Sequence, residues 1–107
     1  MQFTSYLENG NLTIALTGEI DHHSAKEYIQ AIGGKLEAYV PNECVLDFQQ
    51  VTFMDSSGVA VVINALREMT KLQGKLMVCG LGTQPMRVFQ ASGMDKLVQI
   101  KEYTHEV

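Results

Sequence analysis

Residues 51–66 read VTFMDSSGVAVVINAL, and this stretch decides the predicted fold because a strand-forming run passes directly into a helix. Asp55, Ser56, Ser57 and Gly58 lie at the junction, and Asp and Ser are the residue types that most often cap helices. The first backbone N–H groups of a helix lack intrahelical partners and form its positive end. A phosphate group is stabilised at such a position, so the two serines are candidates for capping and for phosphorylation.

The residues before this stretch predict a hairpin followed by a helix. Apolar side chains occupy alternate positions in residues 11–17, which indicates a strand with one buried face. Residues 3–8 are expected to pair with it, because Asn9 and Gly10 accept the positive φ angles of a tight turn.

The first helix is expected to begin at a capping box formed by Ser24 and Glu27, with apolar residues then recurring at helical spacing. Gly33 and Gly34 each cost a helix about 1 kcal/mol relative to alanine, which predicts a bend or an early end. Pro41 closes this segment.

A second strand, a second helix and a third strand surround the DSSG junction. Residues 44–48 predict a short buried strand, and the helix after the junction carries an apolar stripe and ends at Gly74. Residues 76–81 are almost continuously apolar, as in a strand covered on both faces.

The last elements are a third helix and a final strand. Thr83 is the expected cap of that helix, with Pro85 in its first turn and Gly93 after its end, and residues 97–100 form the strand. Strands alternating with helices predict an α/β fold: one domain over residues 1–107, with a mixed, mostly parallel sheet, crossover helices and an antiparallel hairpin at its N-terminal edge.

Three stretches of the chain resemble the STAS domain family, most closely the bacterial anti-sigma factor antagonists of the sporulation and stress-response type. They are LTGEIDHH at residues 16–23, DSSG at residues 55–58 and KLMVCG at residues 75–80, in the order and spacing of the family. Only residues 102–107 follow the last predicted strand, fewer than the C-terminal helix of the family usually needs.

The resemblance implies a phosphorylation switch. In the family the serine after the loop aspartate, here Ser56, is the target of an anti-sigma factor that is also an ATP-dependent serine kinase, and a phosphatase reverses the modification. The unmodified protein binds the anti-sigma factor and releases the sigma factor, whereas the phosphoprotein does not.

The same resemblance implies a partner-binding surface where two parallel strands end. Its expected members are Asp21, His22, Met54, Asp55, Ser57 and Gly58. Met54 is expected as an exposed contact and Gly58 as a position of close approach, although core packing and backbone tolerance explain these two residues as well.

Other functions fit the residues less well. An anion- or nucleotide-binding module would use the same helix N-terminus, but the chain has no glycine-rich phosphate-binding motif. A lipid-transport or scaffold subunit of the same fold would not need the serine pair. Ser56 lacks the Gly-x-Ser-x-Gly elbow of hydrolases, and His22, His23 and Asp21 lack further ligands at metal-site spacing, so we expect no enzyme, metal or cofactor.

Composition limits the partners and the compartment. The net charge is −4 and the eight basic residues are scattered, which argues against nucleic acid and suits a basic protein partner. The longest uncharged runs have eleven residues, well below the ~20 of a membrane span, and no signal peptide opens the chain, so we expect a cytoplasmic protein. Cys44 and Cys79 lie in apolar stretches and are expected to be buried thiols.

Overall fold

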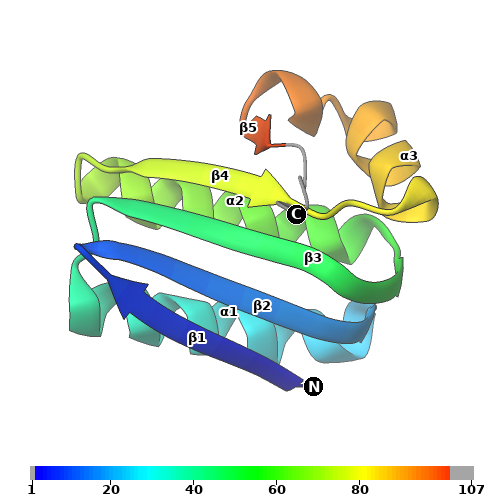
Figure 1. The fold of residues 1–107 in the computed structure, drawn as a ribbon. Helices are drawn as coiled ribbons and strands as arrows, with labels where there is room; N and C mark the ends of the chain where they lie inside the picture. Colours follow the sequence, from blue (N-terminus) through cyan, green and yellow to red (C-terminus); the bar gives the residue numbers. More distant parts are fainter. Residues whose placement is uncertain (1, 102–107) are drawn as a thin grey trace, which may run out of the picture.

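The computed structural model describes residues 2–101, which form a five-stranded sheet with helices packed along one face (Figure 1). The elements are β1 (Gln2–Glu8), β2 (Asn11–Ile20), α1 (His22–Tyr39), β3 (Glu43–Met54), α2 (Ser56–Lys71), β4 (Lys75–Cys79), α3 (Thr83–Ser92), the 3-10 helix η1 (Met94–Lys96) and β5 (Gln99–Lys101). The strands lie in chain order; β1 and β2 are antiparallel and each later pair is parallel. The predicted α/β fold with its antiparallel edge hairpin is confirmed.

The hydrophobic core lies between the sheet and the helices α1 and α2, which Figure 1 shows behind the strands. Leu12, Ile14 and Leu16 of β2 are fully buried, as their alternation predicted. Residues 76–79 of β4 are also buried, which confirms a buried strand there, although it ends at Cys79 and not at residue 81 as expected. The turn between β1 and β2 has φ angles of 55° at Asn9 and 80° at Gly10, in agreement with the predicted hairpin.

Strand β3 is longer than predicted, because it continues past Phe48 to Met54. Its pairing with β2 shifts twice, between Ala15 and Thr17 and between Gly18 and Glu19. Each shift is a β-bulge, and the residues buried after Phe48 are therefore Val51 and Met54, three positions apart instead of two. The extra length brings the strand directly to Asp55.

Helix α1 begins earlier and ends later than predicted. Its N-cap is Asp21, so the expected Ser24 and Glu27 capping box is wrong; Ser24 instead supplies the returning hydrogen bond of a box headed by Asp21. The helix also continues through Gly33 and Gly34 to Tyr39. Its buried stripe extends on both sides of the glycines, and this burial outweighs their low helix propensity.

The segment after β4 partly follows the prediction. Gly82, not Thr83, is the N-cap of α3, and no side chain caps this helix. Pro85 lies in the first turn, and Gly93 ends the helix with a φ of 80°, as predicted. The last strand is Gln99–Lys101 and begins two residues later than predicted, because Leu97 is the helical C-cap of η1, which ends at Lys96. The expectation about residues 102–107 lies outside the described residues.

Both cysteines are free, buried thiols, as predicted. Burial raises the pKa of Cys44 to about 12. Burial, followed by the carboxylate of Asp47, raises the pKa of Cys79 to about 11. Both thiols are therefore protonated at neutral pH.

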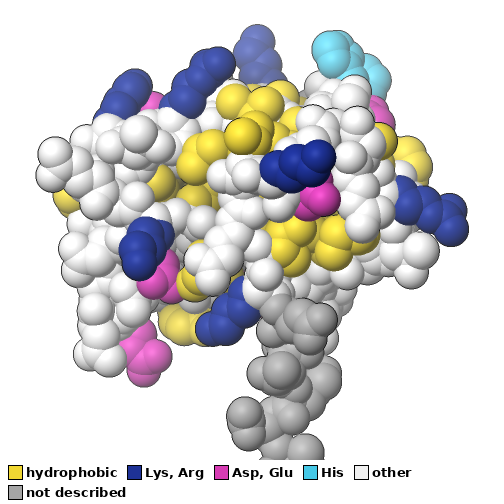
Figure 2. All heavy atoms as spheres, turned by 90° about the horizontal axis from the view of Figure 1, so that it is seen from above, with side chains coloured by type: hydrophobic (Ala, Val, Ile, Leu, Met, Phe, Trp, Pro, Cys, Tyr) yellow, Lys and Arg dark blue, Asp and Glu magenta, His cyan; other side chains and the backbone are white. Residues whose placement is uncertain are grey.

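The surface seen in Figure 2 carries its Lys and Arg side chains as separate points over several elements rather than as one continuous patch. Within residues 2–101, no helix is both long and apolar enough to cross a bilayer.

Candidate functional site

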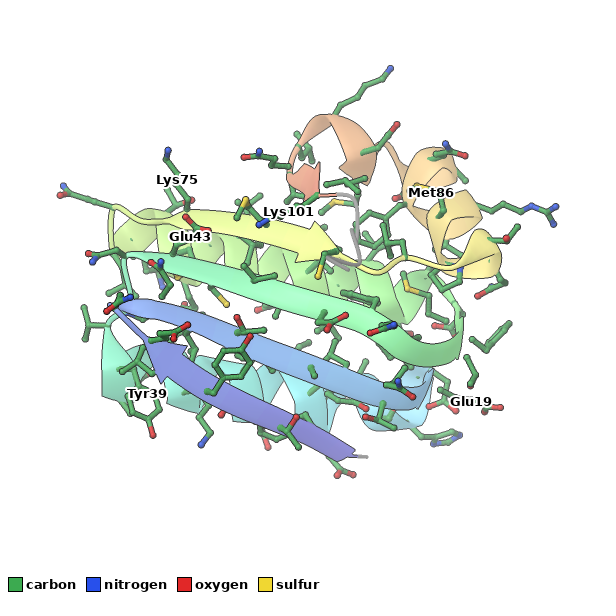
Figure 3. All side chains as sticks on the ribbon, viewed as in Figure 1. Glu19, Tyr39, Glu43, Lys75, Met86 and Lys101 are labelled. Atoms are coloured by element: carbon green, nitrogen blue, oxygen red, sulfur yellow. The ribbon has the colours of Figure 1, made fainter. Side chains whose placement is uncertain are left out.

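The candidate site is the end of the sheet at which β2 and β3 run out. Ile20 and Met54 are paired in the last register position of the two parallel strands, and the Asp55 N–H donates a hydrogen bond to the Ile20 carbonyl at 3.2 Å. Residues 21–23 and 54–58 therefore lie side by side, and we call these two segments together the rim. Figure 3 shows Glu19 at this end of the sheet, and Glu43 and Lys75 at the opposite end.

Asp55 caps helix α2, which leaves the serines free of that task. The Asp55 Oδ1 accepts a hydrogen bond from the Ser57 N–H at 2.7 Å, and the Asp55 carbonyl accepts one from the Gly58 N–H at 3.0 Å. Ser56 is exposed and Ser57 is half-buried, and neither hydroxyl makes a hydrogen bond to another described residue. The capping role suggested for this cluster is thus confirmed for Asp55, and Ser56 presents an unengaged hydroxyl at the positive end of a 16-residue helix.

Asp21 caps helix α1 on the other half of the rim. Its Oδ1 accepts hydrogen bonds from the N–H groups of His23 and Ser24, each at 2.9 Å. The hydrogen bond from Ser24 N–H is the main reason why the pKa of the Asp21 carboxyl lies below its ordinary value. His22 and His23 are exposed first residues of α1 rather than loop residues, and their rings meet edge to face with centroids 5.8 Å apart.

Met54 is a core residue, and the expectation that it is an exposed contact is wrong. Its side chain is 0% exposed. A Cβ placed on Gly58 would lie 2.8 Å from the Met54 Cε and 3.2 Å from its Cβ. The close approach found at Gly58 is thus an internal one, to Met54, and not the approach of a partner that was expected. Core packing explains both residues.

Gln84, on α3, was not singled out by the sequence and holds the end of β3 in place. Its Nε2 donates to the Met54 carbonyl at 2.7 Å and its Oε1 accepts from the Met54 N–H at 2.9 Å. Strand β4 ends at Cys79, so the side chain supplies the two hydrogen bonds that a strand would make on that side of Met54. The residues are 30 positions apart, and no local pattern marks the contact.

Replacing Gln84 by Ala is expected to lower the free energy of unfolding by about 1–3 kcal/mol, because two partly buried backbone groups of Met54 lose their partner. Urea denaturation measures this loss. Gln90→Ala is the matched control, since Gln90 is exposed on the same helix and its replacement should change stability by less than about 0.5 kcal/mol. Equal losses in the two variants would contradict the role of Gln84.

No group of three or more His, Cys, Asp or Glu side chains within residues 2–101 is arranged to hold a metal ion. A hollow of about 350 Å³ lies between α1 and α2, and no rim residue lines it. The rim therefore offers hydroxyl, carboxylate and imidazole groups for contact with another molecule, and its exposed hydroxyl is that of Ser56.

Comparisons with known proteins find relatives over most of the chain. The chain is 28% identical to the anti-sigma-B factor antagonist of Listeria monocytogenes over 94% of this chain and 87% of the relative. It is 29% identical to the anti-sigma F factor antagonist of Paenibacillus polymyxa, over 92% of this chain and 82% of the relative.

Solved structures show the same fold. The unphosphorylated form of the anti-sigma factor antagonist SpoIIAA superposes with a TM-score of 0.83 at 26% identity, over 97% of this chain and 90% of that chain. The phosphorylated form of the Bacillus cell fate determinant SpoIIAA superposes with a TM-score of 0.74 at 26% identity, over 97% of this chain and 93% of that chain. The family profile of the STAS domain matches residues 3–107, and the chain therefore belongs to the STAS domain family.

Proposed function

We propose that this protein is an anti-sigma factor antagonist whose binding is switched by phosphorylation of Ser56. The unmodified form binds an anti-sigma factor through the rim and thereby releases a sigma factor, and the phosphorylated form does not bind. The observation that carries the proposal is the exposed Ser56 hydroxyl, unengaged by other described residues at the start of α2, in a fold shared with a protein solved in unphosphorylated and phosphorylated forms.

The physical basis of the switch is local. A phosphate adds about 1.5 to 2 negative charges at pH 7, directly beside Asp55. Within the protein the helix N-terminus stabilises this charge, so the fold tolerates it. A partner surface that fits a neutral hydroxyl must instead desolvate a dianion, and binding is lost.

The partner in this proposal is an anti-sigma factor with ATP-dependent serine kinase activity, and a phosphatase restores the hydroxyl. The protein itself acts as a regulatory binding protein without a catalytic site, in the cytoplasm. On the rim, Asp21, His22, Asp55, Ser57 and Ser56 are the proposed contact residues. Met54 and Gly58 support this surface from below, because both are buried.

Phosphorylation is expected at Ser56 and not at Ser57. Ser56 is exposed, whereas Ser57 is half-buried with its N–H bound to the Asp55 carboxylate. Incubation with the kinase and ATP, followed by mapping of the phosphopeptide by mass spectrometry, measures the site. Modification mainly at Ser57, or equal modification of a Ser56→Ala protein, would contradict the assignment.

Asp21 is expected to cap α1 and to contact the partner through its charge, and the substitutions Asp21→Asn and Asp21→Ala distinguish these two roles. Asn is as good an N-cap as Asp, so Asp21→Asn should keep the parent melting temperature and Asp21→Ala should lower it. The folded-state pKa of Asp21 is lowered, so its stabilising effect is present above the unfolded pKa and is lost as the pH falls through the folded pKa. If the Asp21 charge meets a basic group of the partner, both variants bind more weakly in a titration. Unchanged affinity of Asp21→Asn would limit the role of Asp21 to capping.

Affinity capture from lysate tests the function itself. A Ser56→Ala bait should retain a protein with ATP-dependent serine kinase activity, and a Ser56→Glu bait should not. Gln90→Glu, which adds the same charge at an exposed position of α3, is the control and should behave like the parent. Capture of no kinase by Ser56→Ala, together with binding of a nucleotide by the isolated protein, would support an anion-binding module instead.

A further inference from the structure

An open pocket of about 560 Å³ lies between the start of α2 and the helix α3, and Ser56 is one of the residues that line it. The lining residues are Ser56, Gln84, Arg87, Val88, Ala91 and Ser92. Arg87 is the single charged residue among these six. Arg87 and the exposed Ser56 therefore line the same hollow.

The wall contributed by α3 is one face of that helix. Gln84, Arg87, Val88 and Ala91 follow the spacing i, i+3, i+4 and i+7, which places their side chains in one stripe. The two hydrogen bonds between Gln84 and Met54 hold this stripe against the end of β3, two residues before Ser56. Arg87 follows Gln84 by three residues on this stripe and lines the same pocket as Ser56.

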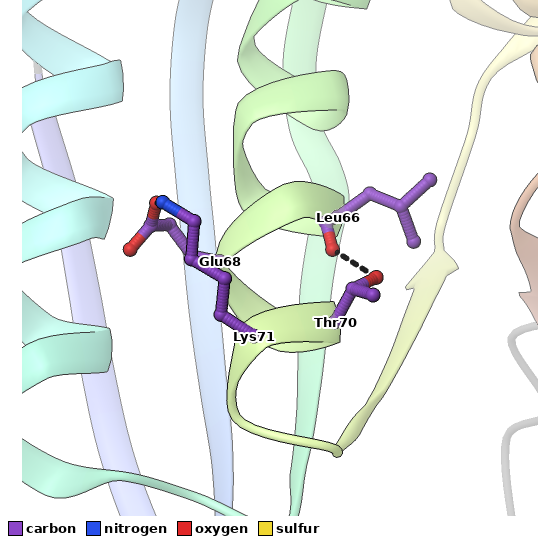
Figure 4. Close-up of polar contacts among 4 residues, drawn as sticks. All are labelled: Leu66, Glu68, Thr70 and Lys71. Carbon is purple, nitrogen blue, oxygen red and sulfur yellow. Dashed lines mark hydrogen bonds and ion pairs between the residues drawn. The ribbon is translucent and has the colours of Figure 1, made fainter.

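The guanidinium of Arg87 is available for a new partner. Arg87 is exposed, and no hydrogen bond or ion pair joins it to another residue in the described part of the chain. The ion pair found there joins Lys71 and Glu68 at 3.1 Å in the last turn of α2 (Figure 4). The other ionisable groups of the rim are Asp55, whose Oδ1 is held by the Ser57 N–H, and the group formed by Asp21, His22 and His23 at the start of α1.

We propose that Arg87 is the internal counter-ion of a phosphate group on Ser56, an inference that rests on the proposed function. The planar guanidinium matches the oxygens of a phosphate and binds them in pairs. The pairing offsets the repulsion between the phosphate and Asp55, and it fills the mouth of the pocket. Phosphorylation then blocks the partner by occupying the pocket as well as by adding charge.

The test uses the 107-residue chain with phosphoserine incorporated at position 56 during translation, so that no kinase is needed. Titration by 31P NMR gives the second pKa of the phosphate, ordinarily about 6. Arg87→Gln should raise this pKa by about half a unit relative to the parent phosphoprotein, the size expected for an exposed ion pair. Arg87→Lys, which keeps the charge without the planar fork, should raise it less.

Arg67→Gln is the matched control, because it removes the same charge from an exposed position of α2 roughly 16 Å along the helix from Ser56. Its phosphate pKa should equal that of the parent. Equal pKa values in Arg87→Gln and Arg67→Gln would overturn the proposal. Titration of the same proteins with the anti-sigma factor reports separately on the proposed function: equal binding by modified and unmodified protein would refute the switch, whatever the phosphate pKa.

Discussion

Phosphorylation of Ser56 is expected to lower the affinity for the anti-sigma factor by a factor of a hundred or more, while the melting temperature changes little. Within the domain, the helix dipole stabilises the phosphate by roughly 0.3–1 kcal/mol, and repulsion from Asp55 removes a comparable amount. At an interface the same dianion must lose its water without a prepared cation in the partner, which costs several kcal/mol. Each 1.4 kcal/mol is a tenfold change in affinity.

Thermal melts and partner titrations of the two forms measure both halves of this expectation. A control protein with phosphoserine in place of Gln90, an exposed residue of α3 that does not line the pocket, carries the same added charge away from the start of α2. It should lose less affinity than the protein modified at Ser56. A phosphoprotein that melts far below the parent would show that unfolding, and not repulsion at the interface, causes the loss of binding.

Truncation of Met54 is expected to destabilise the fold by about 2–5 kcal/mol, because it empties a fully buried site. The cavity would lie directly beneath Gly58 at the start of α2. Met54→Leu conserves the volume and should cost less than about 1.5 kcal/mol. Denaturant unfolding of the Met54→Ala and Met54→Leu proteins measures the two values.

The same two variants show whether Met54 only supports the rim from the core or also contacts the partner. Met54→Leu should bind the partner like the parent, because the side chain does not reach the surface. A large loss of affinity in Met54→Leu, without a loss of stability, would mean that Met54 meets the partner after all.

Local sequence patterns predicted the parts of this fold that depend on local physics. The turn at Asn9 and Gly10 and the helix end at Gly93 depend on positive φ angles that few residue types adopt, so the residues at these positions are enough to predict both features. The alternation in β2 likewise follows from one buried face. These features were confirmed.

The predictions that were wrong concern features that depend on contacts between residues distant in the sequence. The bulges in β3 changed the spacing of its buried residues after Phe48. A search for buried residues at every second position therefore could not locate the end of the strand at Met54. Asp21 was preferred over Ser24 as the cap of α1 because β2 ends directly before it. Met54 looked exposed because it borders a polar loop, but α2 covers it.

In the candidate site too, some features could be predicted from the sequence and others depend on contacts between distant residues. The pairing of Ile20 with Met54 confirmed that residues 21–23 and 54–58 are adjacent, which the resemblance to the STAS family had implied. Gln84 and Arg87 belong to a helix about 30 residues further along the chain, and only the folded structure brings them to Ser56.

One measurement tests the central claim most directly: titration of the anti-sigma factor against a single preparation of protein phosphorylated at Ser56, before and after a phosphatase removes the phosphate. The account predicts weak or undetectable binding before treatment and recovery of the parent affinity, a gain of about a hundredfold or more, afterwards. The same affinity before and after removal of the phosphate would contradict it.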